Sequence, residues 1–114
     1  MLWTNPSPTA SFASQTVNLS DNITNYKMLK FTFRHSNTVS DEVSVITEIN
    51  DLKQYGSAVG KNCTAGVSRT AYGFMSRRLY YVSDTSVSFA NAMQINGSNQ
   101  NNTDCIPIKV TGLK

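Results

Sequence analysis

Apolar and polar residues alternate along several short segments of the chain, and this period of two predicts β-strands with one face toward a core. The clearest segment is 28–34, in which every second residue is Leu or Phe and the residues between them are Lys, Thr and Arg. The same period appears at 43–49, over the nine residues 87–95 and at 106–111. The segment 78–82 has the aromatic and β-branched composition of a strand, although its pattern does not show which face is buried.

Weaker signals lie between these segments. A short strand is expected at 17–19, and a further strand is one interpretation of 64–74. Segment 48–55 is compatible with at most one helical turn. Because Pro107 cannot donate a backbone hydrogen bond, we expect the last strand to lie at a sheet edge or to leave that position unpaired. The tract 96–103 is rich in Asn and is expected to form an exposed loop before the last strand.

Short strands at intervals of roughly 10 to 15 residues predict an all-β fold, a single antiparallel β-sandwich or jelly roll of about six to eight short strands. We expect residues 1–114 to form one domain in which 1–14 is an extended entry segment. The residues expected to be largely buried are the apolar members of the alternating segments, namely Leu29, Phe31, Phe33, Val43, Val45, Val87, Phe89, Ile106, Ile108 and Val110.

The composition narrows the class of protein. Only 15% of the 114 residues are charged, whereas Asn, Ser and Thr together supply one third of the chain. The 11 aromatic residues and the low charge argue against intrinsic disorder. No apolar run is long enough to span a membrane, and the first residues lack the pattern of a signal peptide. The net charge is +3, but the basic residues are scattered, so we expect no nucleic-acid partner.

Few residues could support catalysis or bind a metal. The two cysteines, Cys63 and Cys105, are 42 positions apart, and His35 is the single histidine of the sequence. Two cysteines and one histidine are too few for a zinc site with four cysteine or histidine ligands. We favour buried thiols over one disulfide between them. His35 is expected to be a surface histidine in a turn, and neither a nucleophile elbow nor a phosphate-binding or calcium-binding motif is present. We therefore expect no enzyme activity, no metal and no cofactor.

Hydroxyl, amide and tyrosine side chains on a β-scaffold are typical of adaptable recognition surfaces, including those that bind sugars. The candidate ligand contacts are Tyr55, Tyr72 and Tyr80, and Trp3 is a further aromatic candidate. Tyr55 and Tyr72 each lie beside a glycine in a segment with little strand character. The alternative is that Trp3 and some of the tyrosines pack in the core or between subunits.

Both ends of the chain resemble a known type of domain. The opening LWTNPSPTASFASQTV (2–17) and the ending CIPIKVTGLK (105–114) are similar to the two ends of small β domains in phage tail-fibre and minor structural proteins. The resemblance implies a virion protein assembled in the host cytoplasm, a homotrimer, and contacts with other virion proteins. It also implies that Trp3 and Phe12 dock the entry segment or a neighbouring subunit.

These observations lead to two functional hypotheses. The first is a receptor-facing C-terminal domain of a tail fibre or baseplate protein, which binds a host surface carbohydrate or another cell-surface ligand. We expect its contacts in the loops 36–41, 54–62 and 96–104. The second is a structural or decoration domain that mediates subunit contacts in the virion and binds no ligand. A glycan hydrolase is the least supported class, because no pair of carboxylates can be placed from the sequence.

Overall fold

The computed structural model describes residues 1–54, 74–95 and 97–114, and in these ranges the backbone is mostly β-strand. The elements in chain order are β1 (Trp3–Thr4), β2 (Gln15–Asn18), the 3₁₀ turn η1 (Ile23–Asn25), β3 (Met28–Ser36), β4 (Glu42–Glu48), α1 (Ile49–Leu52), β5 (Met75–Ser76), β6 (Leu79–Ser83), β7 (Ser86–Phe89), β8 (Met93–Gln94) and β9 (Asp104–Leu113). The short helix α1 lies within 48–55, where the sequence allowed at most one helical turn. No helix in the described ranges is long and apolar enough to cross a membrane.

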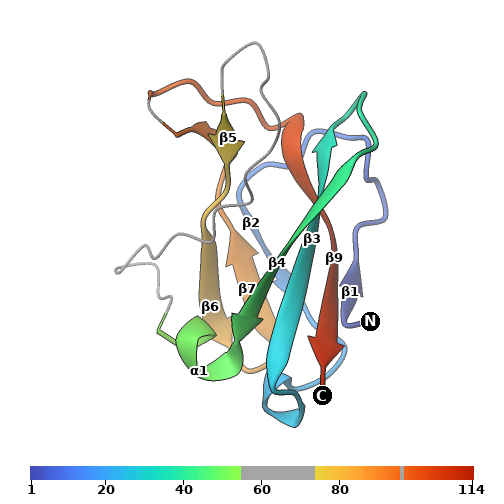
Figure 1. Ribbon diagram of the computed structural model, residues 1–114, viewed down its shortest axis with the longest axis vertical. Helices are drawn as coiled ribbons and strands as arrows, with labels where there is room; N and C mark the ends of the chain where they lie inside the picture. The colour runs from blue at the N-terminus through green and yellow to red at the C-terminus, as the bar shows by residue number, and fades with distance from the viewer. Residues whose placement is uncertain (55–73, 96) are drawn as a thin grey trace.

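Two antiparallel sheets form the body of the molecule (Figure 1). One has the strand order β1-β9-β3-β4 and the other has the order β2-β7-β6, while β5 and β8 pair separately. The Phe89 ring on β7 lies 6.2 Å from Phe31 and 6.0 Å from Phe33 of β3, so the inner faces of the sheets meet. The predicted all-β sandwich is therefore confirmed.

The alternating pattern predicted most of the core correctly. Seven of the ten expected core residues are buried, while the other three, Val43, Val45 and Ile108, are only half-buried and pack against the core. Val43 and Val45 lie on β4, the edge strand of the first sheet, where fewer neighbours cover a side chain. Thr32 was expected on the wet face but is 2% exposed, because central strand β3 places it between Ser44 and Lys109 of its two neighbours.

The prediction drawn from the nine-residue alternation at 87–95 was wrong beyond Phe89. Ala92 is fully buried, whereas Met93 and Ile95 are exposed, the reverse of the predicted faces. The chain leaves the second sheet after the Ala90 N–H donates to the Arg78 carbonyl, and β8 then pairs with β5. A continuous period of two therefore spans two short strands in different sheets.

Pro107 does not place the last strand at an edge, because β9 lies between β1 and β3. The register of the β3–β9 pair shifts between Thr32 and Phe33, and Phe33 is the residue opposite Pro107. The expected edge position was therefore wrong, and the expectation that the donor position of Pro107 is left unpaired stays a prediction. The Asn5 side-chain amide donates to the Pro107 carbonyl at 2.9 Å and secures the entry segment there.

The two ends of the chain lie side by side (Figure 1). Trp3 pairs with Val110 in the sheet, and the Leu2 N–H donates to the Val110 carbonyl at 2.8 Å. A side chain at Gly112 would collide with the Tyr26 ring, which gives the glycine of the C-terminal segment a packing role. The expected entry segment thus contains a strand and packs on β9.

Candidate functional site

A pocket of about 590 Å³ opens where the β5–β8 pair meets the ends of β6 and β7. The residues that line it come from three parts of the chain, namely Ser14, Ser76, Arg78, Tyr80, Ala90, Asn91, Met93, Gln94, Ile95 and Gly97. We call it the Tyr80 pocket. The described residues that line it include no carboxylate, histidine or cysteine; they offer hydroxyl, amide and guanidinium groups for polar recognition.

The sandwich fixes the aromatic side of this pocket. Tyr80 is half-buried on β6, where it pairs with Ser88 of β7. The preceding residue, Leu79, is 1% exposed and anchors the strand in the core. Arg78 is exposed just before β6, and its carbonyl accepts the Ala90 N–H at 3.0 Å. The Tyr80 ring and the Arg78 side chain therefore project from well-held backbone.

A chain of hydrogen bonds fixes one amide of the pocket. The Asn102 Oδ1 accepts the Ala92 backbone N–H at 3.0 Å, so its Nδ2 must be the atom that donates to Asn91 Oδ1, also at 3.0 Å. The same Asn91 oxygen accepts the Ser14 backbone N–H at 2.8 Å. Because a backbone N–H can only donate, the oxygen and nitrogen of Asn91 are assigned by their partners.

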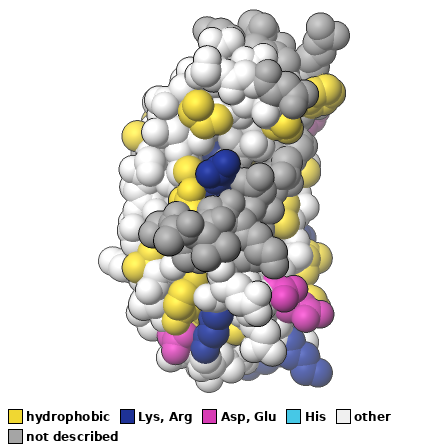
Figure 2. All heavy atoms as spheres, turned by 90° about the vertical axis from the view of Figure 1, so that its left-hand side faces the viewer, with side chains coloured by type: hydrophobic (Ala, Val, Ile, Leu, Met, Phe, Trp, Pro, Cys, Tyr) yellow, Lys and Arg dark blue, Asp and Glu magenta, His cyan; other side chains and the backbone are white. Residues whose placement is uncertain are grey.

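Exposed apolar side chains border the pocket. Met93 is 37% exposed and Ile95 is 48% exposed, and both belong to its lining. Phe74 is 57% exposed. Its backbone carbonyl accepts the Ile95 N–H at 2.9 Å, so it lies next to these two residues. Figure 2 shows the side of the molecule that lies at the left of Figure 1, on which the acidic side chains lie mainly toward the lower end.

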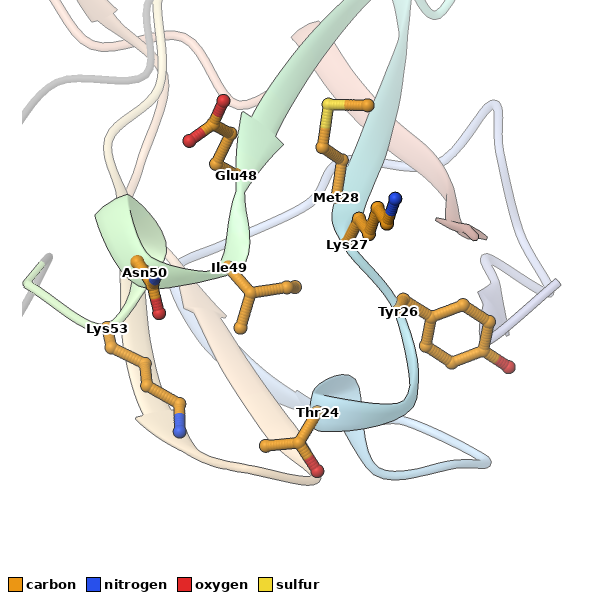
Figure 3. A pocket seen from close by; sticks show the side chains of 8 residues that line it. All are labelled: Thr24, Tyr26, Lys27, Met28, Glu48, Ile49, Asn50 and Lys53. Carbon is orange, nitrogen blue, oxygen red and sulfur yellow. The ribbon is translucent and has the colours of Figure 1, made fainter.

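A second pocket, of about 480 Å³, lies between η1, the start of β3 and α1 (Figure 3). Its lining includes Ile49, which points into it, and Tyr26, whose ring points away from its centre in Figure 3. Lys53 is paired with Asp84 at 3.4 Å. The Tyr81 hydroxyl donates to Asp84 at 2.8 Å, and mainly this hydrogen bond lowers the pKa of that carboxyl. Lys53 and Asp84 thus have partners within the chain.

The structure places the sequence-predicted site residues in different surroundings. Tyr80 lines the pocket described above, whereas Tyr55 and Tyr72 lie outside the described residues. Trp3 and Phe12 lie against Phe89, each with its ring centre 5.9 Å from that ring, and they border a separate pocket of about 480 Å³ at the entry segment. The described structure therefore does not bring Trp3 to Tyr80.

Other chemically active residues serve the scaffold. Arg77 is 1% exposed and donates to four backbone carbonyls, those of Ala90, Asn102, Asp104 and Cys105, at 2.6–3.3 Å. Burial lowers the pKa of Arg77 to about 10. Burial raises the pKa of the Cys105 thiol to about 12, and because Cys63 lies outside the described residues, the absence of a disulfide between them stays a prediction. Among the described residues no group of acidic, histidine and cysteine side chains could hold a metal ion.

His35 does not lie in a turn. It belongs to β3, is half-buried, and its N–H donates to the Asp41 carbonyl at 2.7 Å. Sequence reasoning also missed Ser14, Arg78 and Asn91 as pocket residues. No local pattern marks them, because they are far apart in the sequence and only the fold brings them together.

Comparisons with known protein families, with curated proteins and with solved structures found no match to this chain.

Proposed function

We propose that this chain is a carbohydrate-binding module, and that it binds a host surface glycan in the Tyr80 pocket. The observation that carries the proposal is the combination of a half-buried tyrosine ring with serine hydroxyls and side-chain amides on a rigid sandwich. A ring can lie under the apolar face of a sugar, while amides and hydroxyls bond its oxygens. The resemblance of the two ends to phage tail proteins supports a receptor-facing position on a virion.

Binding of the purified chain to a glycan array of bacterial surface saccharides tests this proposal. Tyr80→Ala should lower the affinity for any glycan that binds by at least tenfold, because it removes the aromatic face. The matched control is Val82→Ala, which trims an exposed apolar residue of the same strand outside the pocket. A failure of the chain to bind any glycan, or equal loss in both variants, would contradict the proposal.

A second candidate function is a structural one, in which the domain mediates subunit contacts in the virion. The exposed residues Phe74, Met93 and Ile95 favour it, because neighbouring apolar side chains on a surface are typical of interfaces. The resemblance implies a homotrimer. Light scattering after size exclusion distinguishes the two functions: a trimer that Phe74→Ser converts to monomers, together with no glycan binding, would favour the structural role.

A further inference from the structure

We infer that the ligand of the Tyr80 pocket is an acidic saccharide, whose carboxylate or phosphate group is bound by Arg78 and by the side-chain amide of Asn91. This inference rests on the proposed function and adds the charge of the ligand to it. It follows from two side chains of the lining, Arg78 and Asn91, which offer a ligand only hydrogen-bond donors.

The first donor is Asn91. Its Oδ1 already accepts from the Ser14 backbone N–H and from Asn102 Nδ2. Neither partner can be reversed, because the Ser14 N–H is a backbone donor and the Asn102 oxygen is held by the Ala92 N–H. Asn91 therefore offers a ligand only the two hydrogens of its Nδ2.

The second donor is Arg78, which is exposed at the pocket and can use five N–H groups. No described residue that lines the pocket carries a negative charge that could neutralise the guanidinium. Arg77, its neighbour in sequence, differs completely, because it is buried and its donors are used by backbone carbonyls. A planar guanidinium that faces a pocket binds carboxylate and phosphate groups through paired hydrogen bonds.

The serine side chains complete this arrangement. The hydroxyls of Ser14 and Ser76 can donate as well as accept, so they adapt to whatever oxygen reaches them. A neutral sugar presents hydroxyls, which both donate and accept, and gains little from a site that mostly donates. An anionic group presents only acceptors and fits such a site.

The test compares three small probes, glucose, glucuronate and glucose 6-phosphate, each titrated into the isotope-labelled chain and followed by amide NMR shifts. We expect at least one of the acidic probes to bind at least tenfold more tightly than glucose and to shift resonances around Tyr80. Stronger binding of glucuronate would identify a carboxylate ligand, and stronger binding of glucose 6-phosphate would identify a phosphate ligand. Raising the salt concentration should weaken the binding of the acidic probes and leave the binding of glucose unchanged.

Two variants test the named donors. Arg78→Gln should remove the preference for the acidic probe, whereas the matched control Lys27→Gln, which deletes one positive charge at the pocket of Figure 3, should keep it. Asn91→Asp keeps the oxygen that accepts from Ser14 and Asn102 but places a negative charge where Nδ2 was. Asn91→Asp should lower the affinity for the acidic probes at least tenfold. Asn37→Asp, the same change at an exposed turn, should leave that affinity unchanged.

The outcomes separate the two proposals. Equal affinity for glucose and for both acidic probes, with binding still lost in Tyr80→Ala, would overturn the inference and leave the proposed function standing. If Lys27→Gln lost the preference for the acidic probes and Arg78→Gln kept it, the inference would also be overturned. The acidic group would then bind in the pocket of Figure 3. Absence of binding to these probes and to every saccharide on the array would overturn both.

Discussion

Phe89 is the residue whose truncation should destabilise the sandwich most, because four aromatic rings surround it. Its ring is 1% exposed and lies 5.9–6.2 Å, centre to centre, from those of Trp3, Phe12, Phe31 and Phe33. Two of these rings come from the entry segment and two come from β3. Phe89 therefore joins both sheets and the start of the chain in one cluster.

The expected loss can be estimated from these contacts. Truncation of a buried Phe to Ala costs about 3–5 kcal/mol, through lost burial and the cavity that remains. Aromatic pairs add about 0.5–1.5 kcal/mol each, not additively, so Phe89→Ala should lie near the upper limit, at about 4–5 kcal/mol. Phe31→Ala, with one ring contact to Phe89 among the described residues, should cost about 3–4 kcal/mol. A domain of this length has a total unfolding free energy of roughly 6–17 kcal/mol.

Urea denaturation measures this loss. The chain has one tryptophan, Trp3, which lies against Phe89 and reports by its fluorescence on the cluster itself, while circular dichroism reports on the sheets. With an m-value of about 2 kcal/mol per molar urea, the midpoint of Phe89→Ala should fall by about 2 M. Phe89→Leu, which keeps most of the volume, should lose no more than about 1.5 kcal/mol. A loss below about 2 kcal/mol in Phe89→Ala, or one smaller than in Phe31→Ala, would refute the reasoning.

Two further predictions concern polar groups. Arg77→Met should destabilise the fold by about 3–5 kcal/mol in the same urea assay, because four carbonyls lose the hydrogen bonds that the guanidinium donates, and two of these bonds are buried; a loss below about 1 kcal/mol would contradict this role. The Tyr26 hydroxyl donates to Asp21 at 2.9 Å, and mainly this hydrogen bond lowers the pKa of that carboxyl below its ordinary value of 3.8. The stability that Asp21 contributes should therefore be present above about pH 4 and disappear as the pH falls through the lowered pKa. Asp21→Asn should be less stable than the native chain at pH 7, and the two should be equally stable once the pH is below that pKa. The same hydrogen bond raises the pKa of Tyr26, and Asp21→Asn should bring the phenolate absorbance transition of Tyr26 back to lower pH; an unchanged transition would show that the bond is absent in solution.

The fold class could be predicted because alternation along a strand is a local property of the sequence. Segment 28–34 shows both faces of β3 in its own residues, and the prediction of its buried side was correct. The prediction for 87–95 was wrong because the switch from β7 to β8 depends on contacts with Arg78 and Asn102, which are distant in the chain. The edge position expected from Pro107 was wrong for the same reason, since β9 is internal only because β1, from the other end of the chain, pairs with it.

Two residues of the pocket lie among the sequence predictions, namely Tyr80 as a named contact and Gly97 within the loop 96–104. Tyr80 was a candidate because aromatic residues suit sugar binding, and it lines the pocket. Arg78 had no visible distinction from its neighbour Arg77, although one is exposed and the other is buried. Sequence alone cannot separate two adjacent arginines that lie just before a strand of uncertain register, because a shift of one residue exchanges the two faces.

The asparagine-rich tract before β9 links the stability of this fold to the polarity of its pocket. Its residues were expected to form an exposed loop, yet Asn102 is half-buried and joins separate parts of the chain. Its carbonyl accepts from the Phe12 N–H and from Arg77, and its side chain holds both the Ala92 N–H and Asn91. A chain with few charges can satisfy buried polar groups in this way, because one amide both donates and accepts. The same bonds determine which atom of Asn91 faces a ligand, so the residues that close the sandwich also set the hydrogen-bonding character of the pocket.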